Sequence, residues 1–203
     1  GVEDIPGTAL HEGIQWEWET FAQYLDALAR REYALDIAVF LPHAPLRVYV
    51  MGERGAANED ATPADIAEMA RHVREAIEAG AVGFSTSRSL NHKSLDGELV
   101  PGTFASEAEL TGLAQAMVDA GGGLFEVVPT GETGADEGVT LGEIGLLADV
   151  SRATGLAVSF LMIQSMGAPE LWRKQLELVE TEGASGARLV PQVSQSSPPP
   201  DGA

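Results

Sequence analysis

Apolar residues recur along this chain in two alternating patterns, one with helical spacing and one extended. The clearest helical pattern follows Thr62, which can cap free backbone N–H groups, and its apolar face continues to a glycine stop at Gly80. A capping box is predicted where Thr140 is followed three residues later by Glu143. Similar spacing predicts four further helices, over residues 21–30, 106–121, 140–155 and 169–180.

Short apolar runs alternate with these helices and predict strands over residues 36–41, 81–86, 123–128, 156–162 and 188–193. The runs are almost continuously apolar, which is typical of parallel strands covered on both faces. Strands that alternate with helices indicate an α/β protein, either an open doubly wound sheet or a (β/α)8 barrel. No glycine-rich phosphate loop follows a strand, and five strands cannot close a barrel of eight. On the barrel interpretation, the chain is therefore part of a barrel.

Composition limits the possible partners and the compartment. The 31 acidic and 12 basic residues give a net charge of −19, which would repel nucleic acids and anionic membranes over most of the surface. We therefore expect neither as a partner. The chain has no cysteine, and no apolar run approaches the roughly 18 residues that span a bilayer. A cytoplasmic location is expected from these features.

The two ends of the sequence suggest a longer protein. The chain opens on a glycine and closes on a polar, proline-rich run. We expect residues 1–194 to form part of a barrel domain and residues 195–203 to be a disordered or aberrant tail. Since an incomplete barrel leaves the edges of its sheet exposed, self-association of the isolated chain is also expected.

Candidate site residues lie where the predicted strands end, because chemistry in α/β folds is found at the carboxyl ends of parallel strands. His43 follows the first strand and could act as a ligand, a general base or a substrate donor, or could be a structural histidine. The loop over residues 85–103 exceeds the roughly 12–15 residues of a plain connection. It carries Arg88, His92 and Lys93, which form either a binding site for a substrate carboxylate or a solvated basic loop.

Three further positions extend this set. Ser85 and Gln164 lie at the ends of the second and fourth strands and are candidates for substrate binding. Glu126 lies inside an apolar strand, where an unpaired carboxylate would be unfavourable. It therefore either faces a metal, a cation or a proton in a barrel interior, or is a solvated side chain at an edge. The histidines show no metal-ligand spacing.

Several stretches taken together, in this order, resemble the N-acyl-D-amino-acid deacylases (D-aminoacylases), family 3 of the amidohydrolase superfamily. The resemblance covers residues 2 to about 193. Its clearest segments are Val-Glu-Asp-Ile-Pro-Gly at 2–7, Pro-His-Ala-Pro-Leu-Arg at 42–47, Val-Met-Gly-Glu-Arg-Gly at 50–55, Gly-Phe-Ser-Thr-Ser-Arg at 83–88 and Val-Pro-Gly-Thr-Phe-Ala at 100–105.

The resemblance implies a (β/α)8 barrel that uses zinc or another divalent metal to hydrolyse the amide bond of N-acyl-D-amino acids. In such an enzyme a metal-activated water attacks the carbonyl. It also implies that this chain supplies roughly strands 3 to 7, because the family's first-strand H-x-H pair and last-strand aspartate are not in the sequence. The isolated chain is therefore expected to be inactive.

The sequence departs from the family at two expected metal ligands. Alignment places Val128 and Met162 where the fifth and sixth strands of the family end in ligand histidines. Valine cannot bind a metal, and a thioether is a poor zinc ligand. Two interpretations follow: a deacylase subgroup with a rebuilt site, in which Glu126 is a candidate ligand, or a degenerate, non-catalytic barrel that binds small carboxylated molecules. An interaction module built on an open sheet is a third class.

Overall fold

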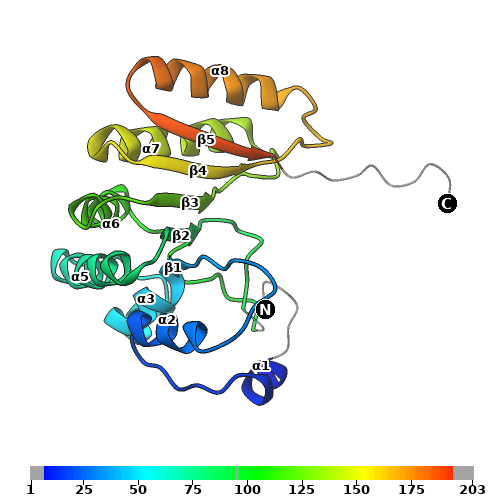
Figure 1. Ribbon diagram of the computed structural model, residues 1–203. Helices are drawn as coiled ribbons and strands as arrows, with labels where there is room; N and C mark the ends of the chain where they lie inside the picture. Colours follow the sequence, from blue (N-terminus) through cyan, green and yellow to red (C-terminus); the bar gives the residue numbers. More distant parts are fainter. Residues whose placement is uncertain (1–6, 95, 194–203) are drawn as a thin grey trace.

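The computed structural model describes residues 7–94 and 96–193, which form a parallel five-stranded sheet and the helices that connect its strands. The strands are β1 (Phe40–Pro42), β2 (Gly83–Ser87), β3 (Leu124–Val128), β4 (Ala157–Met162) and β5 (Arg188–Val193). They lie side by side in chain order, from β1 to β5 (Figure 1). A doubly wound sheet would reverse its strand order at a switch point, whereas a barrel keeps it. The topology therefore confirms the prediction of a partial (β/α)8 barrel.

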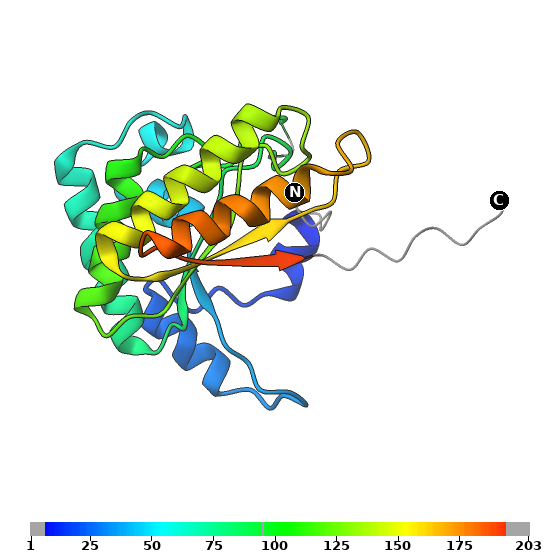
Figure 2. The same ribbon diagram turned by 90° about the horizontal axis from the view of Figure 1, so that it is seen from above.

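Each connection between neighbouring strands contains a long helix, and these helices lie along the same side of the sheet (Figures 1 and 2). They are α5 (Pro63–Ala79), α6 (Glu107–Asp119), α7 (Glu137–Thr154) and α8 (Leu171–Ala184). The start of α5 follows the prediction, since Thr62 and Asp65 form a reciprocal capping box and Gly80 ends the helix with φ of 116°. In the described part of the chain, no helix is long and apolar enough to cross a membrane.

The two faces of the sheet differ in burial. Leu41, Phe84, Phe125 and Val158 lie at matching register positions and are buried under the helices. One position further along, Pro42 and Glu126 are exposed on the opposite face. The connecting helices all pack on one side, so the expected covering of both faces fails at Pro42 in β1 and Glu126 in β3, whereas in β4 Val158, Ser159 and Phe160 are all buried. In a closed barrel the other face would line the interior.

Two predicted elements differ in their bounds. Helix α7 begins at Glu137 with Asp136 as its cap, so the predicted capping box at Thr140 is wrong. Thr140 lies within the helix, and its hydroxyl donates to the carbonyls of Gly131 and Asp136. The first predicted strand is also shorter than expected: β1 has three residues and is followed directly by α3 (His43–Met51) instead of a loop.

The segments before β1 and after α3 contain short helices that the sequence patterns did not predict. They are α1 (Gly7–Gly13) and α4 (Glu53–Ala56). Helix α2 (Phe21–Ala29) agrees with the prediction and packs against α5. The layer of helices therefore extends one position beyond β1, which pairs only with β2 among the described strands. The tail predicted for residues 195–203 lies outside the described residues.

Candidate active site

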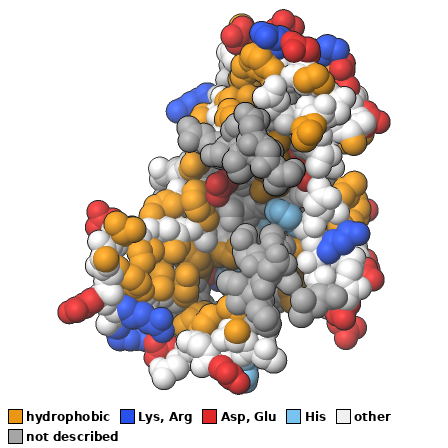
Figure 3. Space-filling model, turned by 90° about the vertical axis from the view of Figure 1, so that its right-hand side faces the viewer, with side chains coloured by type: hydrophobic (Ala, Val, Ile, Leu, Met, Phe, Trp, Pro, Cys, Tyr) orange, Lys and Arg blue, Asp and Glu red, His pale blue; other side chains and the backbone are white. Residues whose placement is uncertain are grey.

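The carboxyl ends of all five parallel strands meet at one end of the sheet, which brings the loops after β2, β3 and β4 to the same side of the molecule. Figure 3 views the molecule from this end and shows hydrophobic side chains gathered in a broad patch on one side, whereas Asp and Glu side chains lie mainly around the margin. The predicted residues at the strand ends therefore come from segments that meet at this end of the sheet.

His43 is the first residue of α3 and lies in the layer between the sheet and the helices. Its side chain is 1% exposed, and its ring packs against Phe84 with 5.1 Å between ring centroids. Its Nε2 lies 2.9 Å from Oε1 of Glu109, and its Nδ1 lies 2.8 Å from Oγ1 of Thr86. An ionised Glu109 only accepts, so Nε2 carries the proton and the Thr86 hydroxyl donates to Nδ1. Both ring nitrogens are thus engaged within the protein.

Glu109 is the centre of this buried cluster. It is fully buried on α6, and Nη1 of Arg47 donates to both of its carboxylate oxygens at 2.6 Å. Nη2 of Arg47 donates to the carbonyl of Glu59 at 2.5 Å. Burial acts to raise the pKa of Glu109, but the hydrogen bond from His43 and the charge of Arg47 outweigh it and lower the pKa. Burial is also the main cause that lowers the pKa of His43, so its imidazole is neutral near pH 7.

Arg88 immediately follows β2 and forms a second buried ion pair. Its Nε donates to Oε1 of Glu143 at 2.5 Å, and its Nη1 donates to the carbonyl of Ala105 at 2.6 Å. The side chain is 8% exposed. Two donors of the guanidinium are therefore already bound to α7 and to the far end of the loop in which Arg88 lies.

The loops after β2 and β3 are joined by a third cluster around Glu132. The hydroxyl of Ser89 and the side-chain amide of Asn91 both donate to Oε1 of Glu132, the latter at 2.8 Å. Beyond this cluster, Nδ1 of His92 lies 2.7 Å from Oγ of Ser87, and Lys93 is exposed. His92 is therefore half-buried against the end of β2, whereas Lys93 faces solvent on the outer part of the loop.

The six predicted substrate-binding residues thus fall into different environments. His43 and Arg88 are buried in separate networks, His92 and Lys93 lie on the outer part of the loop after β2, and Ser85 is half-buried in β2. Gln164 is exposed after β4, and its side-chain amide donates to the carbonyl of Pro169 at 3.4 Å. The parallel topology brings their strand ends to one side, but no hydrogen bond joins His43 or Arg88 to the other four in the described structure.

Sequence reasoning missed the acidic partners of these residues. Glu109 lies three residues after the cap Ser106, and Glu143 lies three residues after Thr140, so both resemble capping residues in the sequence. In the structure, each carboxylate instead pairs with an arginine from a distant segment. No local sequence pattern distinguishes a glutamate that caps a helix from one that pairs with a distant arginine.

The described residues do not fit a metal centre. No group of three His, Asp or Glu side chains among residues 7–94 and 96–193 could hold a metal ion. Glu126 is exposed on the open face of the sheet, level with Ser85 in β2. Met162 is buried and shares its side of β4 with Phe160, which packs in the core under the helices. A metal in the full protein would therefore need ligands from outside this set.

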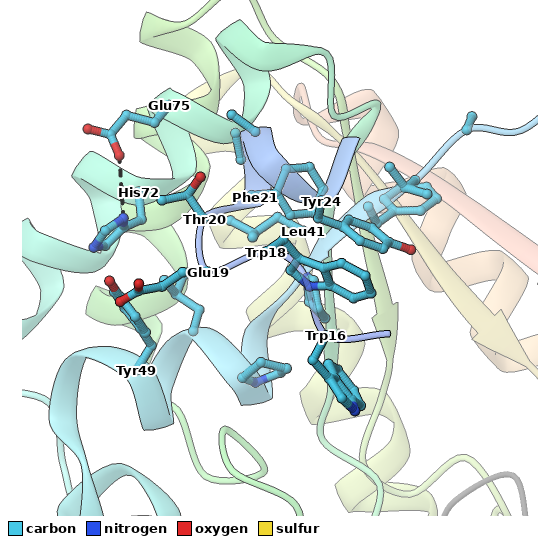
Figure 4. Close-up of a pocket in the computed structure, with 18 residues that line it drawn as sticks. Trp16, Trp18, Glu19, Thr20, Phe21, Tyr24, Leu41, Tyr49, His72 and Glu75 are labelled. Atoms are coloured by element: carbon cyan, nitrogen blue, oxygen red, sulfur yellow. Dashed lines mark ion pairs between the residues drawn. The ribbon is translucent and has the colours of Figure 1, made fainter. Parts of the chain in front are cut away.

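A groove of about 810 Å³ lies at the free edge of β1 (Figure 4). Its walls are mainly apolar and include Trp16, Trp18, Phe21, Leu41 and Leu46. The Trp16 and Trp18 rings pack with 5.5 Å between their centroids. Because α2 continues the helix layer past β1, the groove occupies the position that a further strand would fill beside β1.

Comparison with solved structures agrees with this architecture. An N-acyl-D-glutamate deacylase from Bordetella bronchiseptica, solved with zinc and a phosphonate inhibitor, superposes with a TM-score of 0.64 at 25% identity over 86% of this chain. A D-aminoacylase structure superposes with a TM-score of 0.66 at 22% identity, also over 86% of this chain. The chain covers 34% and 33% of these two proteins, about a third of each.

Sequence comparison gives the same group of relatives. A D-aminoacylase from Alcaligenes xylosoxydans xylosoxydans is 40% identical over 81 residues, which are 40% of this chain and 16% of the relative. An N-acyl-D-glutamate deacylase from the same organism is 33% identical over 100 residues, which are 49% of this chain and 18% of the relative. The chain thus matches only a small part of each. The amidohydrolase family matches residues 6–194, nearly the whole chain, and the protein therefore belongs to the amidohydrolase family.

Proposed function

We propose that this chain is part of a metal-dependent amidohydrolase that cleaves the C–N amide bond of N-acyl-D-amino acids. The observation that carries the proposal is the family match over residues 6–194, together with relatives named D-aminoacylase and N-acyl-D-glutamate deacylase. The zinc-bound structure of a relative supports a divalent metal in the full protein. The described residues do not fit such a site, so we assign no metal ligand to this segment.

The role proposed for this segment is to bind the substrate beside the reacting groups. Lys93 and His92 lie on the outer part of the loop after β2, at the carboxyl end of the sheet, and Arg88 anchors the start of that loop. The ammonium of Lys93, in a chain with a net charge of −19, would attract the carboxylate of an N-acyl amino acid. Ser85 and Gln164 are proposed as neighbouring polar contacts.

The free edge of β1 supports the proposal that other strands complete the barrel. β1 lacks a partner on one side among the described strands, and the apolar groove lies under α2 at that edge. Because the hydrolytic groups are proposed to come from other strands, the 203-residue chain alone should not release amino acid from N-acyl-D-glutamate. We also propose that the isolated chain associates with itself through these edges and that it functions in the cytoplasm.

The test compares the 203-residue chain with a longer protein that contains it and completes the barrel. Only the longer protein should hydrolyse N-acyl-D-glutamate, measured as release of free D-glutamate. In that protein, Lys93→Ala should raise KM several-fold and leave kcat nearly unchanged, because the lysine contributes to binding of a ground-state carboxylate. The matched control is Arg31→Ala, which removes an exposed cation more than fifty residues before the loop. Hydrolysis by the short chain, or equal KM values for both variants, would contradict the proposal.

A second candidate function follows from the residues at two strand ends. Val128 stands where the resemblance places a ligand histidine, and Met162, aligned with the second, packs under the helices, which favours a barrel that binds small carboxylated molecules without hydrolysing them. Calorimetry and metal analysis of the longer protein separate the two functions. Binding of N-acyl-D-glutamate with no stoichiometric metal and no release of D-glutamate would support the binding protein.

A further inference from the structure

The loop between β2 and α6 is long, yet it is held at many points. Its outer part folds back on itself: Lys93 and Leu99 form an isolated antiparallel bridge, and the amide of Ser94 donates to the carbonyl of Glu98 at 2.7 Å. We call residues 92–94 and 96–99 the loop tip. Since the tip carries His92 and Lys93, whatever fixes it also fixes the backbone from which those two side chains extend.

The start of the loop is fixed by two contacts already described. Arg88 bonds the carbonyl of Ala105, which ties the beginning of the loop to its end, and Ser89 and Asn91 bond Glu132 of the next loop. These contacts hold the chain that enters the tip. Apart from the bond to Ala105, they do not reach the chain that leaves the tip, residues 100–105.

Asn58 holds this second half. Its side-chain amide donates to the carbonyls of Leu99 and Val100, both at 3.2 Å, and its Oδ1 accepts from the amide of Gly102 at 2.8 Å. One side chain thus satisfies three backbone groups of a segment more than forty residues away. In the same segment, Thr103 is buried and its hydroxyl donates to the carbonyl of Val100 at 2.7 Å.

The backbone conformation of Asn58 indicates that its contact with residues 99–102 is specific. Its φ is 56°, and among the described residues it is the one non-glycine residue with a positive φ. Such a conformation is uncommon for residues other than glycine and is maintained by the surrounding structure. Asparagine tolerates it better than most residues and also supplies the donors and the acceptor that the loop requires.

Gly102 forms the other side of this attachment. Its φ is 97°, and a Cβ at this position would lie 2.8 Å from Nδ1 of His43. The loop backbone therefore lies directly on the buried imidazole, which is itself held by Glu109 and Thr86. The same short segment therefore contacts both the side chain of Asn58 and the ring of His43.

We propose that Asn58 is a positioning residue that fixes the loop tip, and with it Lys93 and His92, at the carboxyl ends of β2 and β3. The loop is then a preformed wall of the site, not a lid that closes over it. The positioning of a substrate carboxylate rests on the proposed function, whereas the fixed state of the tip does not. A binding group that a rigid support holds in the productive orientation contributes more to substrate binding than the same group on a mobile segment.

The first test uses amide hydrogen exchange of the 203-residue chain and of its Asn58→Gly variant. Glycine keeps the positive φ without strain but removes all three hydrogen bonds. We expect exchange to accelerate about tenfold or more at Gly102 and across residues 93, 94 and 96–100, since the three lost hydrogen bonds hold this segment in place. Exchange in α5 and α6 should be unchanged. Ala57→Gly, which alters the exposed neighbouring residue, is the matched control.

The second test measures KM and kcat of the longer protein, because a displaced loop tip should weaken substrate binding. Asn58→Gly should raise KM for N-acyl-D-glutamate several-fold while kcat stays close to its original value, whereas Ala57→Gly should change neither. Unchanged exchange in the loop would overturn the proposal outright. Faster exchange with an unchanged KM would overturn the role of Asn58 in positioning the binding groups. If the longer protein lacks deacylase activity, the proposed function fails and the exchange measurement alone decides whether Asn58 fixes the tip.

Discussion

Replacing Glu109 by glutamine should remove much of the stability of this chain. Glutamine has nearly the same shape as glutamate, so the substitution leaves the packing around α6 in place and removes the charge. Arg47, which is 1% exposed and donates to both Glu109 oxygens at 2.6 Å, would then be a buried cation without an anion. Its Nε already lacks a hydrogen-bond partner, so the site has no spare acceptor for the remaining donors.

The expected loss of stability follows from the burial of both Glu109 and Arg47. Removing one partner of a buried ion pair typically destabilises a protein by about 3–5 kcal/mol, whereas an exposed pair contributes about 0–1 kcal/mol. A whole domain is stable by about 5–15 kcal/mol, so E109Q would remove a large fraction of that margin. A loss of about 3 kcal/mol lowers the folding equilibrium constant more than a hundredfold.

Urea unfolding, followed by circular dichroism, measures this loss as a shift of the midpoint at constant slope. The matched control is Glu107→Gln, an exposed glutamate in the first turn of the same helix. Its loss should stay below about 1 kcal/mol, the usual contribution of an acidic residue near a helix N-terminus. If E109Q and E107Q unfold at the same urea concentration, the reasoning from burial is wrong.

The same cluster gives two further predictions. The pKa of His43 is lowered below 6.5 in the folded protein, so between that folded pKa and pH 6.5 the unfolded chain binds more protons. The free energy of unfolding should therefore decrease as the pH falls from 7.5 to 5.5, and His43→Gln should make this slope shallower in urea titrations; equal slopes would contradict the assignment. Gly102→Ala should lower Tm more than Gly97→Ala does, because both sites have a positive φ but only Gly102 adjoins the His43 ring. Equal changes in Tm would show that the ring imposes no constraint.

Local sequence patterns determined most of the secondary structure. Thr62 and Gly80 mark helix ends by hydrogen-bonding capacity and backbone freedom, and the structure uses them as predicted. The five strands were predicted from apolar runs, and all five appear in the sheet. The order of elements also gave the fold class, because alternating strands and helices pack into a parallel sheet.

The environment of each candidate residue depended on contacts between distant segments. His43 meets Glu109 across 66 residues, and Arg88 meets Glu143 across 55, so no local spacing could reveal either pair. Asn58 and Glu132 were not recognised at all, since an asparagine or glutamate in a loop has no distinctive pattern. The exposure of Pro42 and Glu126 on the face without helices was also decided by the positions of the helices.

The sequence by itself therefore determined which elements form and where most of them end, because caps, glycines and apolar periodicity act over a few residues. Only the tertiary structure decided which of its charged side chains are buried and which remain available to a ligand. The physical reason is that desolvation and ion pairing depend on the neighbours that packing supplies, and here those neighbours come from other strands and helices.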